Sequence, residues 1–144
     1  MKLELYSVGT SQKRGNVTHA GVGIVLIATD EHGRSLRRDL GFYIGSAQDD
    51  IIELKAARFA LSCVLPQHRK YHTTLHVISS QVPMALSNNN NSNEAKEFAK
   101  WFSFYGDLTI KLELPQNQYV EFAKELANKV AISGAHSDSK SYTV

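Results

Sequence analysis

The sequence predicts an α/β fold in which a mixed five-stranded sheet is flanked by helices. In the first third of the chain, apolar residues alternate with polar ones or run together between glycine-containing turns, which indicates antiparallel strands. From residue 52 onward the apolar residues recur every three or four positions, and the helices predicted by this spacing alternate with strands. Such alternation is typical of parallel crossover connections.

The antiparallel part consists of three predicted strands. Alternation at residues 3–7 indicates a short strand, and we expect the turn-rich stretch 9–16 to be a loop. Residues 21–28 are β-branched and almost wholly apolar, as in a central strand. A turn at 30–33 then leads into a third strand at 34–44.

The helical part begins where the apolar spacing changes. Pro66 ends the first helix, because proline cannot continue the hydrogen-bond ladder, and Asn93 is expected to cap a later helix. The predicted elements are a helix at 52–64, a strand at 72–78, a short helix at 80–86, a helix at 94–104, a strand at 109–114 and a helix at 117–132. We therefore expect one domain at 1–133 and a polar, flexible tail at 134–144.

Length and composition restrict the class of protein. The chain has 144 residues, 42% of them apolar and 21% charged, which fits one globular domain and excludes a disordered chain. The single cysteine, Cys63, excludes an internal disulfide and a cysteine-based zinc site. A net charge of +2 does not by itself indicate nucleic acid. Without a long apolar segment or a secretion signal, we expect a cytoplasmic protein with no membrane partner.

Five short motifs occur in order on the predicted elements. They are Tyr6-Ser-Val-Gly-Thr-Ser11, Gly21-Val-Gly-Ile-Val-Leu26, Ala47-Gln-Asp-Asp-Ile-Ile-Glu-Leu-Lys-Ala-Ala-Arg-Phe-Ala-Leu61, Ile78-Ser-Ser-Gln81 and Ala123-Lys-Glu-Leu-Ala127. Together with the element order they resemble type 1 ribonuclease H over residues 3–131. The resemblance implies a ribonuclease H-like fold.

The same resemblance implies a degenerate active site. Ribonuclease H cleaves the RNA strand of an RNA–DNA hybrid with two divalent cations, Mg²⁺ or Mn²⁺, held by four carboxylates. At the corresponding positions this chain carries Val8, Glu53, Ser79 and Lys124. The short segment 114–119 before the last helix also lacks the family's histidine. The resemblance therefore implies a pseudoenzyme, with no catalytic residues and no metal cofactor, that acts by binding nucleic acid or as a protein scaffold.

Glu53, the one retained carboxylate, has a simpler explanation. Asp50 and Glu53 fit a capping box, in which each side chain accepts from the other's backbone amide, so that Glu53→Ala would cost about 0.5–2 kcal/mol. The enzymatic alternative is a divergent metal-dependent nuclease that uses Glu53, or Asp49, with Glu121 or Glu125 on the last helix.

The histidines His68, His72 and His76 suggest a metal site only at first sight. His72 and His76 stand four residues apart on a predicted strand, at about 3.3 Å per residue, which is too far for a shared ligand set. We therefore expect these histidines on the surface.

Basic residues provide the remaining functional signal. If Lys13 and Arg14 converge with the run at 34–38, they could follow the phosphates of an RNA–DNA hybrid, double-stranded RNA or DNA; the alternative is ordinary solvated charge. The candidate contacts are Lys13, Arg14, Arg34, Arg37, Arg38 and Arg58. The aromatic-rich helix around Trp101 is expected in the core, or as a surface for a protein partner or a homodimer.

Overall fold

The computed structural model describes residues 1–46, 49–87 and 92–144, and the side chains of all of these except Asp49 and Asp50. Its elements are β1 (Lys2–Arg14), β2 (Val17–Thr29), β3 (Ser35–Gly45), α1 (Asp49–Ser62), a 3₁₀ turn (Pro66–His68), β4 (His72–Val77), α2 (Gln81–Met84), α3 (Asn93–Ser103), β5 (Leu108–Leu112), α4 (Gln118–Ser133), β6 (Ser137–Asp138) and β7 (Tyr142–Thr143). Ser92, rather than Asn93, caps α3 through its hydroxyl, which accepts from the Ala95 amide.

The sheet is mixed, as the sequence predicts. β1, β2 and β3 are antiparallel neighbours, whereas β4 runs parallel to β1 and β5 runs parallel to β4. The strand order is β5-β4-β1-β2-β3-β6, and β7 also pairs with β3. Within the described residues the sheet has seven strands rather than the expected five, because two short strands from the C-terminal segment join its edge.

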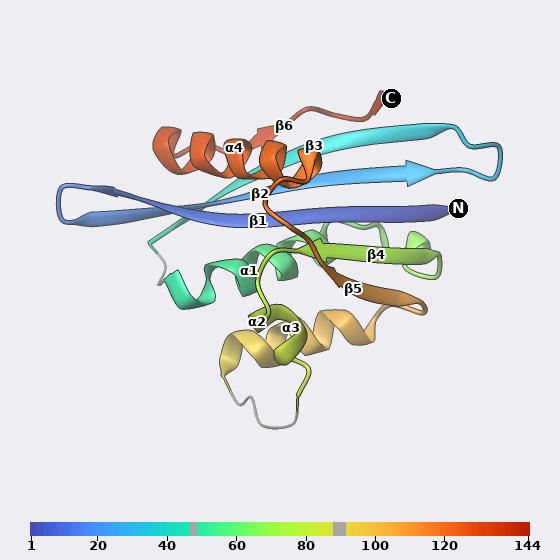
Figure 1. Ribbon diagram of the computed structural model, residues 1–144, viewed down its shortest axis with the longest axis horizontal. Coiled ribbons are helices and arrows are strands. Elements are labelled where there is room, and N and C mark those ends of the chain that lie inside the picture. Colours follow the sequence, from blue (N-terminus) through green and yellow to red (C-terminus); the bar gives the residue numbers. More distant parts are fainter. Residues whose placement is uncertain (47–48, 88–91) are drawn as a thin grey trace.

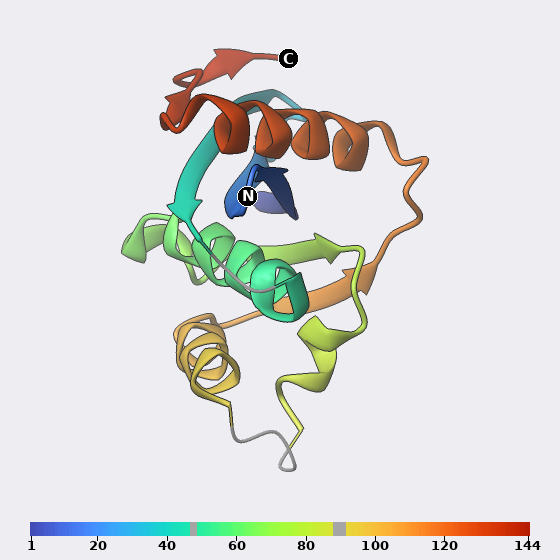
Figure 2. The same ribbon diagram turned by 90° about the vertical axis from the view of Figure 1, so that its left-hand side faces the viewer.

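Helices cover the two faces of the sheet separately (Figures 1 and 2). α4 lies on one face against β1, β2 and β3, and α1 lies on the other face, with α3 packed on the far side of α1. The larger core cluster joins strand residues such as Leu5 and Ile24 to Leu61 of α1 and Phe98 of α3. A smaller cluster lies under α4.

The expected loop at 9–16 is wrong. β1 continues to Arg14 and pairs residue by residue with β2, so that only Gly15 and Asn16 form the turn. Gly9 does not break the strand: a Cβ there would lie 2.2 Å from Cγ2 of Ile52, so glycine permits the close approach of α1. Glycine and small polar residues resemble a loop in sequence, but here they form a regular hairpin.

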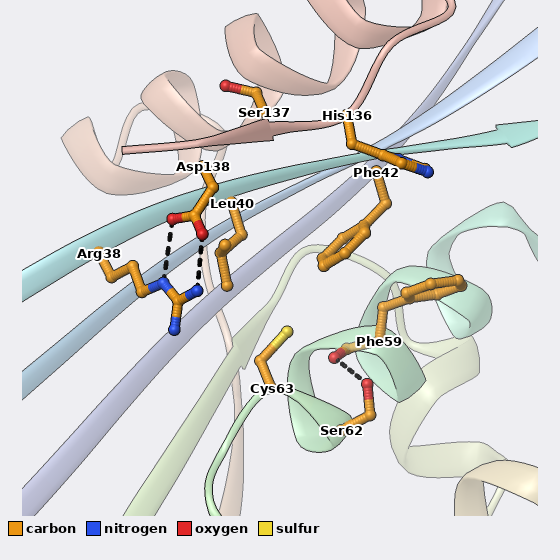
Figure 3. Close-up of a pocket in the computed structure, with 9 residues that line it drawn as sticks. All are labelled: Arg38, Leu40, Phe42, Phe59, Ser62, Cys63, His136, Ser137 and Asp138. Atoms are coloured by element: carbon orange, nitrogen blue, oxygen red, sulfur yellow. Dashed lines mark hydrogen bonds and ion pairs between the residues drawn. The ribbon is translucent and has the colours of Figure 1, made fainter. Parts of the chain in front are cut away.

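The C-terminal segment, which the sequence predicts as a polar, flexible tail, contacts the sheet. β6 and β7 pair with β3, and Arg38 donates two hydrogen bonds, of 3.0 and 2.7 Å, to Asp138 (Figure 3). Ser139 bonds both backbone groups of Asp39, and the Tyr142 hydroxyl donates to the Asp39 carboxylate at 2.6 Å. The polar side chains of residues 134–144 are typical of a solvated tail, but several of them form hydrogen bonds that hold this segment against the edge of β3.

Gly23 of β2 sets the distance between the sheet and α4. A Cβ at this position would lie 1.9 Å from the backbone oxygen of Ala123, so the helix would have to move. We expect Gly23→Ala to lower the free energy of unfolding by about 1–3 kcal/mol, measured by urea denaturation. Gly106→Ala is the matched control, because its Cβ would meet nothing closer than 3.7 Å. Equal effects of the two changes would contradict this account of the packing.

Candidate functional site

The four positions that the sequence resemblance matches to metal ligands lie close to the same part of β1. Val8 is 1% exposed and packs under α4 with Ala123, the residue before Lys124, and with Ile78, the residue before Ser79. Glu53 approaches from α1, and its Oε1 accepts a hydrogen bond of 3.0 Å from the amide of Gly9. The fold thus brings all four positions to the same region, with α1 and α4 contributing from opposite faces.

Glu53 contacts a distant strand, which the predicted capping box does not include. Its Oε1 bonds Gly9, and its Oε2 is buried without a hydrogen-bond partner among the described residues. The Asp50 side chain, the other half of that prediction, lies outside the described residues, as does that of Asp49. Burial raises the pKa of Glu53 from 4.5 to about 7, and the Gly9 hydrogen bond offsets only part of this effect.

The other three positions do not supply metal ligands. Val8 has no donor atom, the Ser79 hydroxyl accepts from the Gln81 amide at 3.2 Å, and Lys124 is an exposed cation. Magnesium and manganese prefer carboxylate oxygens, so this set does not fit the two-metal arrangement. Among the described residues, no three histidine, cysteine, aspartate or glutamate side chains lie together as a metal site, and this includes Glu121 and Glu125.

Comparison with solved structures identifies the architecture. The ribonuclease H1 of the halophilic archaeon Halobacterium salinarum NRC-1 matches 94% of this chain and 100% of its own, with 23% identical residues and a TM-score of 0.70. LC9-RNase H1, a type 1 RNase H with the type 2 active-site motif, matches 94% of this chain and 74% of its own at 12% identity and a TM-score of 0.73. The chain has the ribonuclease H fold.

A third solved structure adds a ligand to the comparison. LC11-RNase H1, solved in complex with an RNA/DNA hybrid, matches 92% of this chain and 98% of its own at 22% identity and a TM-score of 0.67. No protein-family model and no curated protein sequence matches this chain.

On this ribonuclease H fold, the basic residues selected from the sequence do not converge. Lys13 and Arg14 lie at the β1–β2 turn, whereas Arg34 lies at the β2–β3 turn. The 13 residues of β2 separate these two turns by about 40 Å. The hypothesis of one basic track through 13–14 and 34–38 is therefore not supported by the geometry.

Four of the six basic candidates are paired with carboxylates. Arg34 bonds Asp30 at 2.9 Å, Arg37 bonds Asp39 at 2.8 Å and lies over the ring of Phe122, Arg38 bonds Asp138, and Arg58 lies 3.4 Å from Glu94. In contrast, Lys13 and Arg14 are exposed and have no ion pair within the described residues. These two remain the available cations of the set.

His76 is the polar site that sequence reasoning missed. It is 5% exposed, not on the surface, with Nδ1 2.6 Å from a Glu113 oxygen and Nε2 in contact with Glu4. Both nitrogens can donate at once only in the imidazolium form. Burial raises the pKa of both glutamates, but His76, together with Lys2 at Glu4 and Lys111 at Glu113, outweighs burial and lowers the pKa of each. The strand order, in which β4 pairs in parallel with both β1 and β5, brings these groups together.

The other histidines and the aromatic helix fit their simpler interpretations. His72 is exposed and bonds Asp107 at 3.0 Å. Phe98 of α3 is fully buried, and Trp101 packs against the core with Arg69 over its ring. The aromatic residues of α3 thus pack in or against the core, and self-association through this helix stays a hypothesis.

The cavity in Figure 3, of about 570 Å³, lies away from Glu53. It is lined by Phe59 and Ser62 near the C-terminal end of α1, by Cys63 just after α1, by β3 and by the segment around Asp138. Cys63 follows Glu53 by ten residues, or about 15 Å along a helix. Burial raises the pKa of the Cys63 thiol to about 11, which makes it a poor nucleophile. In the part of the chain that the structure describes, no helix is both long and apolar enough to cross a membrane.

Proposed function

We propose that this ribonuclease H fold is a catalytically inactive domain that binds nucleic acid without a divalent cation. One observation carries the proposal: the other three positions matched to metal ligands hold Val8, Ser79 and the exposed Lys124, which makes no ion pair within the described residues. Three of the four positions cannot contribute a carboxylate, and one contributes a positive charge.

The change of charge accounts for binding without metal. A cluster of four carboxylates repels phosphate until cations neutralise it, whereas an unpaired lysine attracts phosphate directly. Glu53 opposes this attraction little near neutral pH, because burial raises its pKa to about 7. The hybrid bound by LC11-RNase H1 supports nucleic acid as the class of ligand. The single, unpaired cysteine fits a reducing compartment such as the cytoplasm, where we propose that the domain acts.

The proposal is tested with the full chain and a labelled RNA–DNA hybrid, using fluorescence anisotropy for binding and gel analysis for cleavage. We expect equal affinity in EDTA and in magnesium, affinity that falls as salt rises, and no cleavage in magnesium or manganese. Lys124→Glu should weaken binding about tenfold or more, because it places an anion against phosphate.

Lys129→Glu is the matched control. Lys129 is also exposed on α4, but five residues further on it points away from the Lys124 side of the helix, so its effect should be smaller. Equal losses from the two changes would remove Lys124 from the site. Cleavage that disappears in Glu53→Gln would replace the proposal with the divergent nuclease.

A further inference from the structure

The β1–β2 hairpin extends beyond the rest of the sheet (Figure 1). Pairing of β1 with β4 ends at Tyr6, and pairing of β2 with β3 begins only at Ala20. Residues 12–19, which we call the arm, therefore have strand partners only among themselves. In Figure 1 the arm projects past the ends of both α1 and α4.

The arm is a regular two-stranded ribbon with a tight turn. Arg14 pairs with Val17 across Gly15 and Asn16, and Gly15 has a φ of 62°, which glycine adopts without strain. A two-residue turn of this kind keeps the strands close and the tip narrow. The arm can therefore enter a groove without first becoming ordered.

The charge of the arm has one sign. From Leu5 to Thr29 the sequence contains no aspartate or glutamate, and Lys13 and Arg14 are exposed at the tip without ion pairs in the described residues. The arm also contains no phenylalanine, tyrosine or tryptophan, so it lacks the rings on which single-stranded bases stack. His19, its one aromatic-like side chain, is bonded to the Tyr43 hydroxyl at 2.7 Å.

The base of the arm is fixed to the face that carries Lys124. Gln12 donates a hydrogen bond of 2.9 Å to Asn128 of α4, and Asn128 lies one helical turn after Lys124. Arg14 follows Gln12 by two residues and so lies on the same strand face. Lys124, the Gln12–Asn128 amide pair and Arg14 thus form a continuous polar surface from the candidate site to the arm tip.

We propose that the arm enters the major groove of a B-form DNA duplex while Lys124 contacts its backbone. A two-stranded ribbon fits this groove, which is about 12 Å wide, whereas the major groove of A-form RNA is too narrow for side chains to read. Lys13 and Arg14 contact phosphate or guanine edges at the tip. The inference rests on the proposed nucleic-acid binding and adds to it a preference for DNA duplex.

The test compares the full chain with Lys13→Gln/Arg14→Gln, using a labelled DNA duplex, the matching RNA–DNA hybrid and the single DNA strand in EDTA. The parent should prefer the DNA duplex. The double variant should lose about tenfold or more in duplex affinity, and the slope of log affinity against log salt should fall by about 2, since two phosphate contacts are removed.

Lys96→Gln/Lys100→Gln is the matched control, because it removes the same charge from exposed positions on α3. Equal losses from the two double variants, or parent affinity for the single strand that equals its affinity for the duplex, would overturn the role of the arm. The proposed function fails separately, if the parent binds none of the three ligands or if Lys124→Glu binds them as well as the parent. Melting temperatures of both double variants should match the parent, since these exposed side chains form no ion pair with any described residue.

Discussion

Glu53→Gln is expected to stabilise the protein above neutral pH and to change its stability little in acid. In the folded chain Glu53 is buried, its Oε2 has no partner among the described residues, and its pKa is raised from 4.5 to about 7. Between these two values the folded state holds a proton that the unfolded state has released. The parent protein should therefore lose stability as pH rises through this window, by about 3 kcal/mol once the pH exceeds 7.

Glutamine keeps the shape of the protonated acid and an oxygen that can accept from Gly9, but it never ionises. We expect the free energies of unfolding of parent and variant, measured by urea denaturation from pH 4 to pH 9, to separate above pH 4.5, the ordinary pKa of a glutamate. The variant should be the more stable of the two. Glu125→Gln is the matched control: Glu125 is exposed on α4 without an ion pair in the described residues, so its curve should follow the parent. Parallel curves for Glu53→Gln and the parent would show that the carboxylate ionises freely.

This expectation reverses the one drawn from the sequence for the same residue. The spacing of Asp50 and Glu53 is that of a capping box, which would make Glu53 stabilising. The structure instead turns the Glu53 carboxylate toward Gly9, 44 residues earlier in the chain. Local spacing identifies a local hydrogen bond well, but it contains no information about a strand that packs against the helix from elsewhere.

Most helices and strands were predictable because their sequence signals are also local. Runs such as 21–28 and the helical spacing around Ala56 depend only on neighbours in the chain, and both predictions are confirmed by β2 and α1. The errors occurred where the hydrogen-bond partners belong to another strand or segment. Residues 9–14 look like a loop until β2 pairs with them, and Asp138 looks solvated until Arg38, 100 residues away, binds it.

The candidate site shows the same division. The resemblance selected Val8, Glu53, Ser79 and Lys124 by motif, and the fold brings these positions to one region. The sequence could not indicate which basic side chains lack an ion pair, because ion pairing depends on carboxylates contributed by other elements, such as Glu94 beside Arg58. Nor could it place His76 between Glu4 and Glu113, which requires the strand order.

Rebuilding the carboxylate cluster should make the stability of the protein depend on metal. In Val8→Asp/Ser79→Asp/Lys124→Asp, three new carboxylates would stand around Glu53. Without metal we expect a large loss of stability, because like charges repel at short range and because Val8 is 1% exposed, so its replacement buries a charge. Manganese should restore stability by binding only the folded state, by about 2.7 kcal/mol at a hundredfold excess over its dissociation constant.

The measurement is the melting temperature with and without manganese, for the parent, the aspartate triple variant and a matched triple variant with asparagine at the same positions. Asparagine has the same size and polarity but no charge, so this control should respond as little as the parent. If the Val8→Asp change prevents folding because it buries a carboxylate, Ser79→Asp/Lys124→Asp retains Val8 and still offers three carboxylates with Glu53, and its response to manganese should exceed that of the matching asparagine pair. The correspondence of the four positions with a metal cluster would be wrong if neither aspartate variant responds more than its asparagine control, because the side chains would then not converge on one ion.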